Sequence, residues 1–210
     1  MRVLFRGYQY TLFDAKEKKM LDSSVILPTF FGEFKSQSGK LACGRLSKKR
    51  VKEIGEHNLT AEQKYFQENV KVKTHLFVSV SYEGKTQDGE TSTVTNALCL
   101  YNPSSKAAYT IDEVLAGVEK EGRTIPLTTL NVKTKREKTG DNVYYVPVVE
   151  VEQGAAAPDA QVVEHIRTAV GFVESSNEYI TKRYTEVLAG GKSTDPALDS
   201  IAENMWEDGE

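Results

Sequence analysis

Apolar and polar residues alternate over short stretches of the first 150 residues, a pattern typical of β-strands. The clearest stretch is Thr74–Tyr82, in which every second residue from Leu76 onward is apolar. Thr91–Tyr101 has a similar composition and follows a loop at residues 83–90 that contains two glycines. We expect these two stretches to pair as an antiparallel hairpin.

Further strand candidates flank this hairpin. Val3–Leu12 alternates in the same way, and Val25–Phe34 is apolar but interrupted by a proline and a glycine. Thr124–Val132 and Asn142–Val151 enclose the polar sequence KTKREKTGD, which we expect at the tip of a second hairpin. Several short strands separated by turn signals predict a β-rich α+β protein, with an OB-like antiparallel barrel or sandwich.

Two short helices are expected before the Thr74–Tyr82 strand. The first covers Ser47–Ile54. The second is predicted over Ala61–Val70, because Thr60 and Gln63 have the spacing of a capping box.

A third helix is predicted after the Thr91–Tyr101 strand. Thr110 and Glu113 repeat the capping-box spacing directly before two apolar residues, so the helix is expected to begin there. Gly122 is expected to end it.

The last quarter of the chain predicts one long helix and a tail. A linker at residues 152–158 separates the β-rich body, residues 1–151, from apolar positions at three- and four-residue steps over residues 159–189. Asp159 would cap this helix and Gly190 would end it. Its length of ~45 Å allows it to pack on the body or to pair with a partner chain, including a second copy in a homodimer.

The charge distribution is uneven. The 210 residues have a net charge of −3, but residues 1–150 carry 23 Lys and Arg against 18 Asp and Glu, a net +5. Residues 151–210 carry 4 against 12, a net −8, of which −5 lies in residues 192–210. A basic body with an acidic C-terminal region is typical of a protein that binds a polyanion.

Several classes of protein are disfavoured. No apolar run approaches the ~20 residues that cross a membrane, and the first residues do not form a secretory signal. Two cysteines, Cys43 and Cys99, are expected to be buried, and three scattered histidines show no metal-ligand spacing. With no nucleophile signature either, we expect a cytoplasmic, non-enzymatic protein without a cofactor.

Two basic patches are candidate phosphate contacts. The first, at residues 45–52, has five cations in eight residues, and the second lies in KTKREK. The cations selected from these two patches are Lys48, Lys49, Arg50, Lys133, Lys135, Arg136 and Lys138.

Aromatic residues on polar strand faces are candidate stacking surfaces for bases. Phe77 points away from the apolar face of its strand, and Tyr101 shares a face with polar residues. Tyr144 and Tyr145 point to opposite faces, so that only one can be a contact; we select Tyr144.

The tail combines acidity with an apolar group. The residues expected to bind a partner are Ile201, Met205, Trp206 and Asp208. Together with the basic, tyrosine-rich body and the KTKREK hairpin, this layout resembles single-stranded DNA-binding proteins, particularly those of bacteriophages. The resemblance implies an OB-fold that binds single strands without sequence preference and a tail that recruits replication or recombination proteins.

Other readings of the sequence stay open. The bound strand could be DNA or RNA, because nothing in the residues distinguishes them. The chain could also be a protein–protein interaction module, for a host enzyme or a scaffold, without affinity for nucleic acid. In that reading the long helix and the tail would be the binding surfaces.

Overall fold

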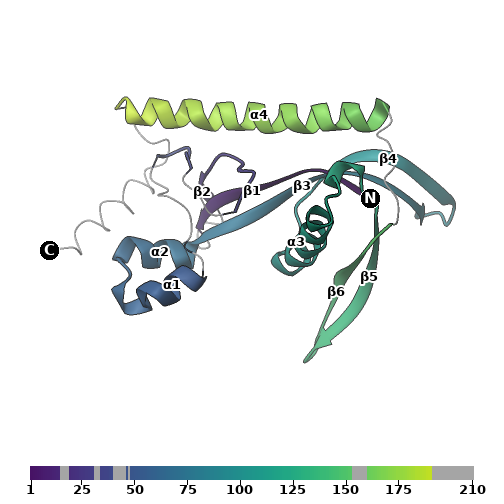
Figure 1. Cartoon of the computed structure of the whole chain (residues 1–210), viewed down its shortest axis with the longest axis horizontal. Coiled ribbons are helices and arrows are strands. Elements are labelled where there is room, and N and C mark those ends of the chain that lie inside the picture. Colours follow the sequence, from purple (N-terminus) through teal and green to yellow (C-terminus); the bar gives the residue numbers. More distant parts are fainter. Residues whose placement is uncertain (15–18, 31–33, 40–45, 47, 153–159, 191–210) are drawn as a thin grey trace. The chain divides into compact units, whose positions relative to one another are not determined.

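The computed structural model describes residues 1–14, 19–30, 34–39, 46, 48–152 and 160–190. The protein is α+β, with about 40% strand in antiparallel arrangement and a long C-terminal helix, which confirms the predicted class (Figure 1). The elements in chain order are β1 (Arg2–Asp14), β2 (Lys19–Ser23), α1 (Lys48–Ile54), η1 (Glu56–Asn58), α2 (Ala61–Asn69), β3 (Val70–Lys85), β4 (Thr91–Tyr101), α3 (Ser105–Lys120), η2 (Ile125–Leu127), β5 (Leu130–Thr139), β6 (Asn142–Val151) and α4 (Ala160–Leu188).

The described strands form two sheets. One has four strands in the order β2-β1-β3-β4, and the other is a two-stranded ribbon of β5 and β6. The predicted hairpin of β3 and β4 is confirmed, with Leu76 opposite Tyr101, although β3 is longer than the predicted Thr74–Tyr82. A bulge near Asn96, which has a φ of +49°, shifts the register and ends the strict alternation in β4.

The strand expected at Val25–Phe34 is wrong. In the described part of this segment, Leu27 makes only an isolated bridge to β1, and the strand that pairs with β1 lies earlier, at β2. The N–H of Ile26 donates to Asn177 Oδ1 at 2.6 Å, and its carbonyl accepts from Asn177 Nδ2 at 3.0 Å. Because a side-chain amide occupies both groups and Pro28 has no N–H, the segment does not continue as a strand.

The contacts divide the chain into two compact units. Unit 1 comprises Met1–Arg6 and Thr74–Phe172, and unit 2 comprises Gly7–Lys73 and Val173–Glu210. β1, β3 and α4 therefore contribute residues to both units. The predicted division into a body, a long helix and a tail stays a prediction.

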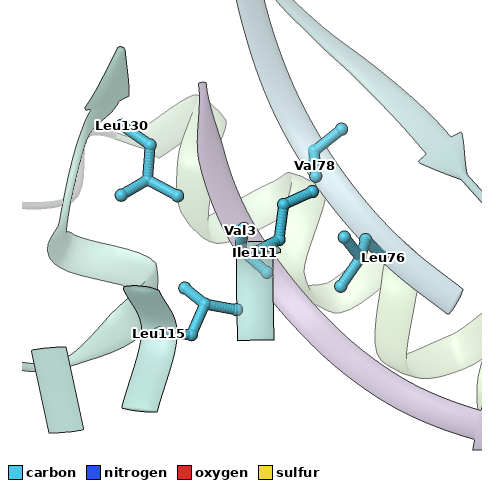
Figure 2. Close-up of a cluster of buried hydrophobic side chains, with 6 residues drawn as sticks. All are labelled: Val3, Leu76, Val78, Ile111, Leu115 and Leu130. Carbon is cyan, nitrogen blue, oxygen red and sulfur yellow. The ribbon is translucent and has the colours of Figure 1, made fainter. Parts of the chain in front are cut away.

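Each unit has its own apolar core. The core of unit 1 joins β1, β3, α3 and β5, and its buried members are Val3, Leu76, Val78, Ile111, Leu115 and Leu130 (Figure 2). The core of unit 2 contains Tyr10, Leu12, Leu21 and Val70. In unit 2 the ring of Tyr10 is stacked on Phe34, with 4.6 Å between ring centroids.

Helix α3 begins earlier than predicted. Thr110 is not its cap but lies within it, where its Oγ1 donates to the carbonyl of Lys106 at 3.2 Å. The buried face already starts at Ala107, so packing against the core extends the helix beyond the local capping signal. The predicted end is confirmed, since the helix ends at Lys120 and Gly122, with a φ of +70°, directly follows the C-cap residue Glu121.

The two helices before β3 are confirmed. α1 covers the described part of the predicted Ser47–Ile54. At the start of α2 the capping box is formed as predicted: the Thr60 N–H donates to Gln63 Oε1 at 3.0 Å, and the Gln63 N–H donates to Thr60 Oγ1 at 3.1 Å.

The long C-terminal helix is also confirmed as α4. Its buried residues include Val162 and Ala169 in unit 1, and Val173 and Ile180 in unit 2. In each unit this helix thus buries apolar residues against its own chain. A homodimer through its exposed face stays a prediction.

Candidate functional site

The four cations of the second basic patch lie along strand β5 rather than at a hairpin tip. β5 and β6 pair over their whole lengths, and only Gly140 and Asp141 form the turn. Gly140 has a φ of +59°, as the first central position of a type II′ turn requires. The predicted hairpin at KTKREKTGD is present, but the expectation that the whole sequence lies at its tip is wrong, because this tight turn lets strand pairing continue through the basic residues.

Strand pairing separates the ribbon into two faces, since directly opposite residues share a face and neighbours along a strand alternate. We call the side that contacts α3 the inner face; it carries Glu137, Tyr144 and Val146. At the base of the ribbon, the opposite side carries Leu130, Val149 and Val151, which pack in the core of unit 1. We call the rest of this side the outer face, and its members are Val132, Thr134, Arg136, Lys138, Val143, Tyr145 and Pro147.

A lysine of α3 forms hydrogen bonds with residues of the inner face. Lys106 Nζ donates to Glu137 Oε2 at 2.6 Å and to the Tyr144 hydroxyl at 3.4 Å, and it lies 4.8 Å from the centroid of the Tyr144 ring. The Tyr144 hydroxyl is also 3.1 Å from Thr139 Oγ1. Tyr144 is therefore engaged with α3 and does not point outward, contrary to its selection as a stacking residue.

The ion pair changes the acidity of both partners. The hydrogen bond from Lys106 lowers the pKa of the Glu137 carboxyl below its ordinary value of 4.5. The same bond raises the pKa of Lys106 above its ordinary 10.5. The pair therefore contributes stability above the ordinary pKa of Glu137 and loses it as pH falls through the lowered value. At alkaline pH the contribution is complete below the ordinary pKa of Lys106 and is lost as pH rises through the raised value.

Replacing Lys106 with methionine is expected to return the titration of Glu137 to its ordinary range, because the hydrogen bond that favours the carboxylate is removed. An NMR titration of the Glu137 carboxyl carbon measures this change. Lys120→Met, on the same helix, is the control and should leave the midpoint unchanged. Equal midpoints in wild type and Lys106→Met would contradict the ion pair.

The outer face combines cations with an exposed aromatic ring. Arg136 lies directly opposite Tyr145, and Lys138 lies opposite Val143. Tyr145 is 67% exposed. Within the ribbon, which the structure describes completely, this face holds no carboxylate, and among the described residues neither cation forms an ion pair.

The other two cations of β5 alternate onto the face that carries the acids. Lys133 Nζ is 3.6 Å from Glu150, and Lys135 Nζ is 4.0 Å from Glu137. Their charge is thus partly balanced by neighbouring carboxylates. Arg136 and Lys138 carry the unbalanced charge of the ribbon.

Tyr145 is the residue that sequence reasoning missed. The sequence shows that Tyr144 and Tyr145 face opposite sides, but not which side α3 covers. The Gly140–Asp141 pair was the available signal, because a two-residue turn there sets the register and places Tyr145 opposite Arg136.

The two predicted stacking residues of the larger sheet, Phe77 and Tyr101, differ in accessibility. Phe77 is only 5% exposed, and its ring lies 6.0 Å from Phe5 and 5.3 Å from Phe172. The expectation that the Phe77 ring is exposed is wrong, because Phe172 of α4 covers this ring. Tyr101, at the end of β4, is 39% exposed. Cys99, which we expected to be buried, is exposed on the same strand.

The remaining predicted residues do not belong to the ribbon. Lys48, Lys49 and Arg50 are exposed on α1 in unit 2, and Arg50 is 3.2 Å from Glu53, whereas the ribbon belongs to unit 1. Cys43 and the predicted partner-binding residues lie outside the described part of the chain, the latter being Ile201, Met205, Trp206 and Asp208.

Among the described residues, no three His, Cys, Asp or Glu side chains form a group that could hold a metal ion. No described helix has the length and apolar character needed to cross a membrane. Comparison of the chain with protein-family models, curated proteins and solved structures gives no match.

Proposed function

We propose that this protein binds single-stranded nucleic acid through the outer face of the β5–β6 ribbon. The proposed ligand is single-stranded DNA, and RNA is the alternative. The observation that carries the proposal is the direct pairing of exposed Tyr145 with Arg136, on a face that holds Lys138 and no carboxylate. Stacking on an aromatic ring accepts any base, and phosphate contacts carry no sequence information. The binding is therefore expected to be largely independent of sequence.

The geometry of the ribbon suits both parts of a nucleotide. A guanidinium can pair with a phosphate through two parallel hydrogen bonds, and its planar group also stacks. Residues directly opposite in an antiparallel pair have Cα atoms about 4.5–5.5 Å apart, so the Tyr145 ring and the Arg136 head group can contact adjacent parts of one strand. The ion pair of Lys106 with Glu137 keeps the inner face on α3 and leaves the outer face free.

Three finer parts of the proposal rest on the sequence. The OB-like assignment is supported by the antiparallel strands and by the resemblance to bacteriophage single-stranded DNA-binding proteins. Lys48, Lys49 and Arg50 are proposed as additional phosphate contacts on α1. The acidic segment at residues 192–210 is proposed to recruit replication or recombination proteins, and to compete with DNA for cations when no partner is bound.

The test is fluorescence anisotropy of a labelled dT strand of about 30 nucleotides, longer than a single binding domain needs. Wild type is expected to bind at low salt and to weaken as salt rises. In Arg136→Gln/Lys138→Gln, the slope of log K against log salt should become shallower by about 1.4, since each phosphate contact to a single strand contributes about 0.7. Lys120→Gln, an exposed lysine of α3 in the same unit, should keep the wild-type slope.

Other arms of the experiment distinguish the alternatives. A chain ending at Gly191 is expected to bind dT more tightly than the full chain, because the acidic competitor is removed. An rU strand of equal length reports the preference between DNA and RNA. If the full chain and the shortened chain both fail to bind either strand at low salt, the proposal fails. The exposed Val132 and Val143 would then favour a protein-binding face.

A further inference from the structure

Strand β4 is an edge of the four-stranded sheet, because the strand order is β2-β1-β3-β4. It is eleven residues long, TSTVTNALCLY, and contains no charged residue and no proline. An edge strand presents unpaired backbone N–H and C=O groups that can template the addition of another strand. Native proteins usually protect such edges with charges, proline, bulges or short length.

β4 carries one protective feature, and it covers only part of the strand. The bulge at Asn96 interrupts the strand in its middle, where the Asn96 N–H donates to Ser81 Oγ at 2.9 Å. The five residues after it, Ala97–Tyr101, have no such feature. In this segment Leu100 is 42% exposed, and Cys99 and Tyr101 are also exposed.

The charges of the sheet edges indicate which strand fits β4. Two copies of β5 would repel each other if they paired edge to edge, since each β5 strand carries four cations. β2 is only five residues long. Two copies of β4, by contrast, can pair with each other without bringing any charges together. Their apolar residues would also lie opposite one another, which stabilises a cross-strand pair.

We propose that two copies of this chain form a dimer by antiparallel pairing of Ala97–Tyr101 across a two-fold axis at Cys99. In this register Cys99 lies opposite Cys99, Leu98 opposite Leu100, and Ala97 opposite Tyr101 of the second copy. The axis lies at the centre of the segment between the bulge and Pro103, which cannot donate to a ladder. The interface is isologous, as two-fold dimers require, and it does not depend on the proposed nucleic-acid binding.

Cysteine chemistry tests the register directly. Opposite residues of an antiparallel pair have Cα atoms about 4.5–5.5 Å apart, within the range that a disulfide spans. In Cys43→Ser, in which Cys99 is the remaining cysteine, mild oxidation is expected to convert most of the protein to a covalent dimer. Cys43→Ser/Cys99→Ser should give none. Absence of the covalent dimer at concentrations where sedimentation shows a dimer would overturn the proposed register.

Sedimentation with charged variants tests the surface. Leu100→Lys places two like charges at the proposed interface and should raise the dimer dissociation constant at least about tenfold, because juxtaposed like charges at an interface cost several kcal/mol and each ~1.4 kcal/mol is tenfold. Tyr179→Lys, on the exposed face of α4, is the matched control and should dimerise as wild type. Circular dichroism verifies that both variants fold. If Leu100→Lys does not fold, the oxidation of Cys99 is the test of the proposed dimer. A monomeric wild type, or a dimer lost only in Tyr179→Lys, would overturn the proposal.

Discussion

Replacing Tyr145 with alanine is expected to weaken binding of the dT strand by about 5- to 150-fold, because loss of one stacking aromatic costs ~1–3 kcal/mol. Tyr145 is the most exposed large hydrophobic residue of the ribbon, and it lies opposite Arg136. Because stacking involves no phosphate, the slope of log K against log salt should stay close to that of wild type. Anisotropy at several salt concentrations measures both quantities.

Two variants separate the ring from other effects at this position. Tyr145→Phe keeps the aromatic face and should bind almost as wild type, since stacking does not need the hydroxyl. Tyr82→Ala removes a similarly exposed tyrosine from β3, outside the ribbon, and should have no effect. If Tyr145→Ala binds as wild type, or if Tyr82→Ala weakens binding equally, the outer face is not the stacking surface.

Replacing Leu130 with alanine is expected to reduce the free energy of unfolding by ~2–5 kcal/mol, the usual cost of a large-to-small change in a packed core. Leu130 is 1% exposed and packs with Val3 and Leu115 in the core of unit 1 (Figure 2). It is also the first residue of β5, and its N–H donates to the carbonyl of Met1 at 2.7 Å. The substitution therefore loosens the base of the ribbon as well as the core.

Urea denaturation followed by circular dichroism measures the loss of stability, and hydrogen exchange of β5 amides reports the ribbon itself. Val132→Ala is the matched control, two positions along the same strand and on the same face, because Val132 is 41% exposed. It should change the free energy of unfolding by no more than about 0.5 kcal/mol. Equal losses in both variants would show that Leu130 does not anchor the ribbon in the core.

Elements with a complete local signal were predictable from the sequence. Thr60 and Gln63 satisfy each other's N–H groups within one helical turn, so the start of α2 needs no distant contact. The apolar steps of α4 and the alternation around Val78 in β3 are equally local. The candidate cations of the ribbon were also identified, because charge is a property of the residues themselves.

Tertiary contacts decided which of these residues face solvent. Helix α3 begins before the box at Thr110 because the buried face from Ala107 onward adds packing energy that the local signal does not contain. Val25–Phe34 is not a strand because Asn177, about 150 positions later in the chain, binds the backbone of Ile26.

The same distinction applies to the proposed binding face. Alternation in the sequence establishes that Tyr144 and Tyr145 point to opposite sides, and that Phe77 points away from Leu76 and Val78. It does not say which side another element will cover. Phe172 of α4 covers Phe77, and Lys106 of α3 engages Tyr144, so Tyr145 alone of these three rings remains on an open face. Residue type and periodicity are local properties of the chain, whereas exposure depends on packing between residues far apart in sequence.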